Sequence, residues 1–261
     1  MVLLVLDVQR GITNDGLFAF DTFCSNLDLL INEARENGVE VIYVRHDDGP
    51  DSGFSKGDED FEIYQPLEPK ADEKIFDKTV NSAFHKSVGL VNYLKKRAEK
   101  QIMLVGLQTE FCMDATVKSG FEHGFEMFVP EYSNSTFDND YFSGELGYKL
   151  YNEFMWPNRY AKCVSIEKAV ELLKSADCLK SDINDLLNNL DKLSTTELGA
   201  ARIKKNLNVE TEDIVSWCKK EILSENAVIT RNGKNWYVNV NGNVFTVNGS
   251  RYTIITARKG R

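Results

Sequence analysis

The hydrophobic and polar positions of the chain follow two different rhythms. In the first 175 residues or so, short apolar runs alternate with stretches whose apolar residues recur at helical spacing. Val2–Leu6 is a continuous apolar run, as expected of a strand that is covered on both faces. Residues 21–37 have the helical spacing and end before Gly38, which is a common helix stop.

The alternation continues through the rest of this segment. The pattern predicts strands at 39–44, 74–76, 101–105, 125–129 and 161–165, and helices at 87–97, 109–123 and 166–174. Strands separated by helices of this length indicate an α/β fold with a doubly wound, mostly parallel sheet and helices on both faces. The polar stretch from His46 to about Lys70 predicts a long loop, of a length that is usually functional or disordered.

The rhythm changes near residues 175–182. Helical patterns at 183–190, 196–207 and 211–223 follow one another, and short strands separated by three Asn-Gly dipeptides follow from residue 227. Asn-Gly is a strong hairpin signal. We therefore predict two domains, an α/β domain over residues 1–178 and a small α+β domain with an antiparallel meander over residues 183–261.

Composition and charge narrow the function classes. The 261 residues are 42% hydrophobic and 27% charged, as in ordinary globular proteins. No apolar run is long enough for a membrane span, and the first one lacks the basic flank of a signal peptide, so a cytoplasmic protein without a membrane partner is expected. The net charge of −9 argues against nucleic acid as a partner. Residues 182–261 hold 12 Lys and Arg against 9 Asp and Glu, whereas residues 1–181 hold 19 against 31, so the sign of the charge changes near the domain boundary.

The five cysteines do not form a disulfide or zinc pattern. Their number is odd, their spacings are wide, and no Cys-x-x-Cys pair occurs. Most are expected to be small buried hydrophobic residues. Cys112 differs from the others because of its position along the predicted fold.

Three reactive side chains follow predicted strands. Asp7 follows the first strand, Lys78 the short third one, and Cys112 stands near the start of the helix after the fourth. Because the carboxyl ends of parallel strands meet at one edge of a sheet, an acid, a base and a thiol are expected to meet there. With Thr109 as N-cap, Cys112 falls in the first helical turn, where the helix dipole and Lys78 would favour the thiolate. Asp7 would accept the thiol proton and return it to a leaving amine.

Short motifs surround these three residues. They are Leu6-Asp7-Val8-Gln9, then Asp77-Lys78 followed by Ser82-Ala83-Phe84, then Gly106-Leu107-Gln108-Thr109-Glu110-Phe111-Cys112. Together they resemble the isochorismatase-like cysteine hydrolases over about residues 1–175. The resemblance implies a catalytic triad of Asp7, Lys78 and Cys112. It also implies a non-proline cis peptide at Leu107–Gln108, with the backbone N–H groups of Gln108 and Cys112 lining an oxyanion hole.

The chemistry of that family suggests a reaction. Members with the cysteine hydrolyse small amides through a thioester, whereas the isochorismatases proper cleave a vinyl ether and lack it. Cys112 therefore implies hydrolysis of a small-molecule amide or carbamoyl C–N bond. Nicotinamidases also hold a metal with Asp-x-His and a further histidine, but the only histidines here are His46, His85 and His123, and none forms that motif. No metal and no other cofactor is therefore expected. Related hydrolases tend to be oligomeric, so a homo-oligomer is expected as a partner state.

Four further residues are candidates to shape the substrate pocket. They are Gln9, Phe84, Phe137 and His46, the last of which stands beside two aspartates after the second strand. The alternative for the first three is second-layer packing. For His46 it is a hydrogen bond that anchors the loop.

Two other functions stay open at this point. The domain could hydrolyse a non-amide small molecule without a covalent step, or it could sense a metabolite without turnover. The second domain does not decide between them. Leu193-Ser194-Thr195-Thr196-Glu197-Leu198-Gly199 and Asn232-Gly233-Lys234-Asn235-Trp236-Tyr237-Val238 resemble a small family of uncharacterised bacterial domains, which implies no activity.

Overall fold

A computed structural model of the chain describes residues 1–224 and 226–260, except for the side chains of residues 177–184. The chain divides into two compact units, Met1–Ala176 and Asp177–Arg261. No helix in the described residues is long and apolar enough to cross a membrane.

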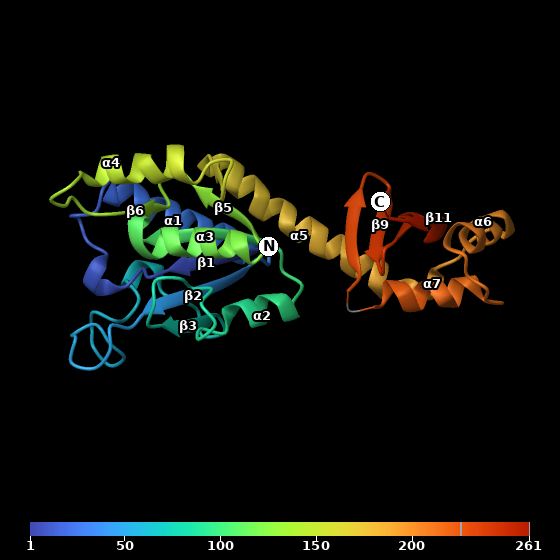
Figure 1. The fold of residues 1–261 in the computed structure, drawn as a ribbon, viewed down its shortest axis with the longest axis horizontal. Coiled ribbons are helices and arrows are strands. Elements are labelled where there is room, and N and C mark those ends of the chain that lie inside the picture. The colour runs from blue at the N-terminus through green and yellow to red at the C-terminus, as the bar shows by residue number, and fades with distance from the viewer. Residues whose placement is uncertain (225, 261) are drawn as a thin grey trace. The chain divides into compact units, whose positions relative to one another are not determined.

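The first unit is built on a parallel sheet (Figure 1). Among the described residues its seven strands are β1 (Val2–Leu6), β2 (Glu40–His46), β3 (Lys74–Lys78), β4 (Gln101–Leu107), β5 (Glu126–Pro130), β6 (Asn134–Ser135) and β7 (Lys162–Val164). The order is β3-β2-β1-β4-β5-β7, with β6 paired to the end of β4, and every pairing is parallel. This confirms the predicted fold, and the strand order reverses between β1 and β4, where α/β proteins usually bind ligands.

Helices connect these strands. They are α1 (Phe20–Glu36), α2 (Leu90–Lys96), α3 (Asp114–Glu122), α4 (Gly144–Lys149) and α5 (Ile166–Asn188), with short 3-10 turns η1 (Arg10–Ile12) and η2 (Gln65–Leu67) and π-helical turns η3 (Thr109–Met113) and η4 (Leu150–Met155). Leu3 and Val5 of β1 pack with α1 and α5, whereas Leu4 and Leu6 pack with α2 and α3. Both faces of the sheet are therefore apolar core, and the polar chemistry collects at the strand ends.

Helix α5 differs from the sequence prediction, and the structure shows how the predicted long loop is held. Helix α5 runs unbroken over Ile166–Asn188, where two helices with a break at 175–182 were predicted. That stretch holds no Gly or Pro, so nothing in it stops a helix. The polar stretch after His46 is anchored rather than free, because Phe61, Ile63 and Leu67 are buried within it.

The second unit holds an antiparallel meander and helices that pack against it. Its sheet order is β11-β10-β9-β8, formed by β8 (Val228–Asn232), β9 (Asn235–Val240), β10 (Asn243–Asn248) and β11 (Thr253–Lys259). The helices are α6 (Glu197–Leu207) and α7 (Ile214–Ile222), preceded by the 3-10 turn η5 (Leu190–Lys192). Ile203 of α6 and Cys218 of α7 share one buried cluster with Trp236 and Phe245 of the sheet. The predicted α+β fold is confirmed.

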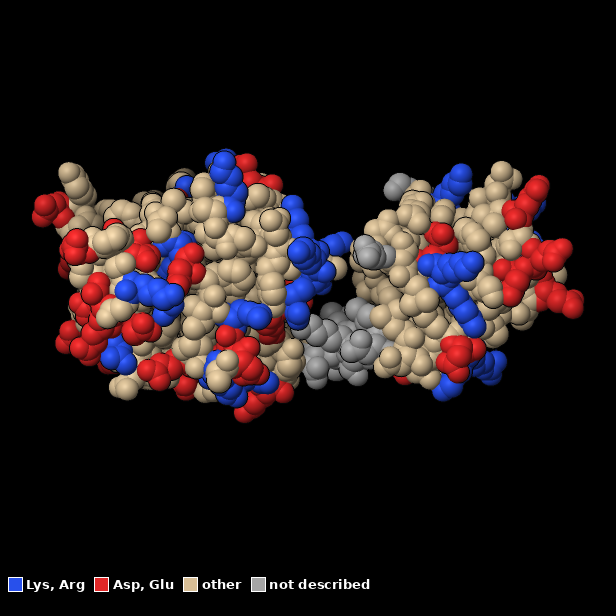
Figure 2. Space-filling view, turned by 90° about the horizontal axis from the view of Figure 1, so that it is seen from below, with Lys and Arg blue, Asp and Glu red and all other residues tan. Residues whose placement is uncertain are grey.

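Charge is distributed as the sequence indicates. Figure 2 shows Asp and Glu side chains on both units, and on the first unit they gather at its left end. This agrees with the 31 acidic residues against 19 basic ones in residues 1–181.

Candidate active site

The ends of four strands bring reactive side chains together. Asp7 follows β1, His46 ends β2, Lys78 ends β3, and Cys112 lies in η3 directly after β4. The Nζ atom of Lys78 lies 2.7 Å from Asp7 Oδ2 and 3.3 Å from Cys112 Sγ. The structure thus places the predicted acid and the predicted thiol against the buried ammonium group of Lys78, the predicted base.

Asp7 is held in a demanding conformation. Its φ is +52°, and its backbone N–H donates to Val44 O at 2.8 Å. This left-handed region is unfavourable for most L-residues and is tolerated by Asp, Asn and Gly. Its Oδ1 atom is buried without a hydrogen-bond partner, whereas Oδ2 accepts from Lys78. Burial raises the pKa of this carboxyl group, and the neighbouring Lys78 charge only partly opposes that shift.

Cys112 sits in a π-helical turn rather than in the first turn of an α-helix. Gln108 caps η3, and α3 begins only at Asp114, so the prediction of Thr109 as the N-cap was wrong. The reason is a competing partner, because the Thr109 hydroxyl donates to the buried Asn134 side chain of β6 at 2.8 Å. This bond ties the turn that carries Cys112 to the sheet.

Burial is the main influence on the acidity of the Cys112 thiol. Burial, and then the Asp7 charge, raise its pKa to about 12, and Lys78 lowers the pKa by less than these two raise it. Lys78 favours the thiolate as expected, but burial and the Asp7 charge outweigh its effect on the thiol pKa. An oxygen of the Asp7 carboxylate and Cys112 Sγ lie within 4.8 Å of each other, so the carboxylate stands beside the thiol.

This thiol pKa predicts the pH dependence of alkylation. Because iodoacetamide reacts with the thiolate, the alkylation rate of Cys112 should not level off at pH 9, the ordinary thiol value, but keep rising toward 12. Asp7→Asn removes the Asp7 charge, which is the second cause of the raised thiol pKa. The alkylation rate of Cys112 in this variant should therefore level off at a lower pH than in the wild type. Peptide mass spectrometry over a pH series measures both. A wild-type midpoint at or below pH 9 contradicts the prediction.

His46 makes more contacts with this cluster than the sequence indicated. Its Nδ1 atom lies 2.9 Å from Lys78 Nζ and 4.0 Å from Cys112 Sγ, and its Nε2 atom lies 3.0 Å from Asp48 Oδ1. Gln9, which is fully buried, holds the His46 backbone: its Oε1 accepts from His46 N at 2.7 Å and its Nε2 donates to His46 O at 3.0 Å. Gln9 therefore contacts the cluster through His46.

Two residues around this cluster, Asp48 and Asn81, were not predicted as site residues. Asp48 was seen only as a neighbour of His46, and its contact with the ring requires the folded loop. Asn81, whose Oδ1 lies 3.9 Å from Cys112 Sγ, belongs to no motif. No sequence signal distinguishes it from any other polar loop residue.

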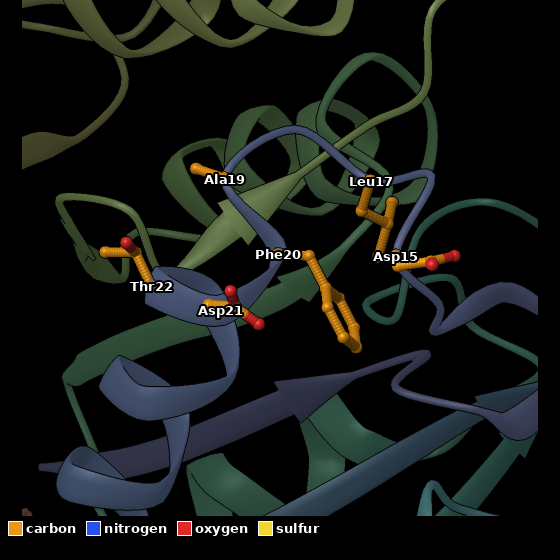
Figure 3. A pocket seen from close by; sticks show the side chains of 6 residues that line it. All are labelled: Asp15, Leu17, Ala19, Phe20, Asp21 and Thr22. Atoms are coloured by element: carbon orange, nitrogen blue, oxygen red, sulfur yellow. The ribbon is translucent and has the colours of Figure 1, made fainter.

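Two other pocket candidates, Phe84 and Phe137, pack against apolar neighbours. Phe84 is buried in the core, with its ring centroid 5.3 Å from that of Phe125. Phe137 is partly buried and forms an isolated bridge with Leu17. Leu17 lines a surface pocket at the start of α1 (Figure 3), together with Asp15, Ala19, Phe20, Asp21 and Thr22. That pocket contains none of the reactive residues and no nucleophilic thiol.

Comparison with known proteins places the fold in a family. The family model for the isochorismatase domain matches residues 1–144, more than half of the chain. This chain belongs to the isochorismatase family. An uncharacterized isochorismatase family protein of Bacillus subtilis, YrdC, is 31% identical over 130 residues, which cover 49% of this chain and 69% of that protein. Residues 187–258 match a family of unknown function, DUF3781.

Amidohydrolases are among the relatives of this isochorismatase family member. Nicotinamidase 3 of Arabidopsis thaliana is 25% identical over 152 residues, covering 53% of this chain and 74% of that protein. The ureidoacrylate amidohydrolase RutB of Acinetobacter baylyi is 24% identical over 159 residues, covering 46% and 64%. The crystal structure of a cysteine hydrolase from Pseudomonas syringae shares the fold, with a TM-score of 0.60 at 20% identity over 67% of this chain and 92% of that one.

One expectation drawn from the family resemblance is not met. The peptide bond between Leu107 and Gln108 is trans, since the described residues contain no cis peptide. A trans bond avoids the cost of a non-proline cis peptide, and the chain here has Gly106 at φ +131° just before it. Leu107 is buried in the core and Gln108 caps η3. The oxyanion-hole role of the Gln108 and Cys112 amides stays a prediction.

A metal does not fit this isochorismatase-family site. Asp7, His46 and Cys112 offer a carboxylate, an imidazole and a thiol, which is a set that zinc accepts. However, the Lys78 ammonium already lies 2.7, 2.9 and 3.3 Å from atoms of these three residues. A cation of the protein therefore occupies the place that a metal would take.

Proposed function

We propose that the first unit hydrolyses a small amide or carbamoyl C–N bond through a thioester on Cys112. One observation carries this proposal: the buried Lys78 ammonium contacts both Asp7 Oδ2 and Cys112 Sγ. A nucleophile with an acid–base partner in reach is the arrangement that covalent hydrolysis needs. Relatives named nicotinamidase and amidohydrolase support the amide class of substrate.

The first half of the reaction follows from the positions of these groups. Cys112 Sγ attacks the substrate carbonyl carbon while its proton passes to Asp7, and the carbonyl π electrons move to the oxygen. Collapse of the tetrahedral intermediate breaks the C–N bond, and Asp7 returns the proton to the departing nitrogen. The product is ammonia or an amine, and the acyl group remains on Cys112.

Lys78 balances charge during this exchange. The ammonium is 2.7 Å from the carboxylate and 3.3 Å from the sulfur, so it stays beside the negative charge whichever of the two groups carries it. In a buried site an unbalanced charge is costly. The Lys78 charge therefore helps the proton to move between the Cys112 thiol and the Asp7 carboxylate, whose pKa values are both raised.

The test uses the wild-type chain with a panel of small primary amides and carbamoyl compounds. We expect ammonia release, and acid quenching during turnover should leave an acyl adduct on the peptide that contains Cys112. Cys163 serves as the internal control, since burial raises the pKa of its thiol to about 12 as well but no lysine or acid bonds to it in the described residues.

The alternatives give different results in the same assay. Hydrolysis without any adduct on Cys112 would favour a non-covalent isochorismatase-type reaction. Thermal stabilisation by a panel compound without turnover would favour a metabolite-sensing module. Either result would overturn the thioester proposal.

A further inference from the structure

The side chains around Cys112 differ in how far they are exposed to solvent. The side chains of Lys78 and Asp7 are 0% and 2% exposed, whereas those of His46 and Asp48 are 18% and 56% exposed. Hydrolysis of a thioester needs a water molecule, and water reaches the cluster from the exposed side. The side chain that meets it there is His46 rather than Asp7.

The contacts of His46 fix which nitrogen can act as a base. An ammonium group only donates hydrogen bonds, so Nδ1, 2.9 Å from Lys78 Nζ, must accept. The ring proton is then on Nε2, which donates to Asp48 Oδ1 at 3.0 Å. Nδ1 also lies 4.0 Å from Cys112 Sγ. Cys112 Sγ, the His46 imidazole and the Asp48 carboxylate thus form successive contacts, which resembles the general arrangement of a nucleophile, a base and an orienting group.

We propose that His46, oriented by Asp48 and held by Gln9, is the base that activates water to hydrolyse the thioester. This inference rests on the proposed thioester chemistry and divides the proton transfers between two bases. Asp7 serves the attack of the thiol and the departure of the amine, deep in the site. His46 serves the incoming water at the exposed side.

The step balances as follows. His46 Nδ1 takes a proton from water as the water oxygen bonds to the thioester carbonyl carbon and the carbonyl electrons move to oxygen. Collapse of that intermediate breaks the C–S bond and releases the acid, with the electron pair remaining on Cys112 Sγ. The imidazolium then returns its proton to the thiolate, which restores the resting thiol and neutral His46.

Lys78 must release Nδ1 for this step. In the acyl-enzyme the sulfur carries no negative charge, and Asp7 is again a carboxylate after protonating the amine. Asp7 Oδ1 has no hydrogen-bond partner in the resting protein, so it can accept the N–H that leaves His46. The ion pair with Asp7 holds the lysine while water takes its place at the imidazole.

The experiment compares His46→Gln with the wild-type chain on an amide that the wild type hydrolyses. Glutamine can still accept a hydrogen bond from Lys78 but cannot act as a base at neutral pH. We expect thioester hydrolysis to slow by about a hundredfold or more, while the first turnover changes by only a few fold. The variant should release a burst of one ammonia per chain and accumulate the acyl adduct on Cys112. Hydroxylamine, which attacks thioesters without a base, should restore turnover.

Matched variants separate this role from a structural one. Asp48→Asn should also accumulate the acyl adduct on Cys112, but less of it than His46→Gln does. His85→Gln, at an exposed histidine whose ring bonds to Ser87, should behave as wild type. Equal slowing of both half-reactions in His46→Gln and Asp48→Asn, with no adduct and no hydroxylamine rescue, would overturn the inference. If the wild-type chain also forms no acyl adduct on Cys112, both this inference and the proposed function are overturned.

Discussion

Cys112→Ala should lower kcat/KM for amide hydrolysis by at least about four orders of magnitude, because the alanine side chain cannot form the covalent intermediate. Alanine removes Sγ and leaves the Lys78–Asp7 ion pair, so substrate binding should weaken far less than kcat falls. Steady-state ammonia release over a substrate series separates the two parameters. The intact ion pair should also keep the variant folded.

Cys163→Ala is the matched control for this loss. Cys163 is a thiol of β7 with a similarly raised pKa of about 12, caused by burial. Its removal should leave kcat unchanged. Activity that survives in Cys112→Ala, or an equal loss in Cys163→Ala, would refute a thioester on Cys112.

Gly106→Ala should destabilise the first unit by more than about 4 kcal/mol, the range of severe substitutions. A Cβ at this position would lie 1.9 Å from the carbonyl oxygen of Leu6, and the φ of +131° is unfavourable for an L-side chain. Leu6 and Gly106 are paired in the β1–β4 register, so the clash falls on backbone that cannot move without breaking the pair. Hydrogen exchange of the β1 and β4 amides in urea reports this unit separately.

Gly124→Ala controls for backbone strain alone. Gly124 also has positive φ, +83°, but nothing lies within 4 Å of an added Cβ. Its cost should be only about 1–2 kcal/mol from the left-handed conformation. If the two alanine variants differ by less than about 1 kcal/mol, close approach of the strands is not what requires Gly106.

Most strands of the sheet can be predicted from the sequence, because the buried strands consist of continuous runs of apolar residues. Val2–Leu6 and the run within Gln101–Leu107 needed no tertiary information. Strand β6 was not predicted, because Asn134 and Ser135 are polar residues buried by partners distant in the chain. The Asn134 side chain bonds to Thr109 and Asn152, and no local pattern encodes such contacts.

The candidate site was predictable to the extent that topology determines it. Asp7, Lys78 and Cys112 stand at strand ends, and parallel strands bring their ends together. The thiol pKa was not predictable, because burial of Cys112 and the charge of Asp7 outweigh Lys78 only in the folded protein. The contact of His46 with Lys78 was hidden for the same reason, since it depends on a loop that Phe61 and Ile63 anchor in the core.

The left-handed backbone at Asp7 has a consequence for the sequences that selection can reach. In a library randomised at this position, folding should admit Asp, Asn and Gly, whereas catalysis should admit Asp alone. The folded but inactive survivors should therefore be Asn and Gly, and Glu, although chemically the nearest acid, should be lost from both pools. Position 7 is therefore constrained both by its backbone conformation and by the need for a carboxylate. Sorting the library once by stability and once by turnover would measure the two constraints separately.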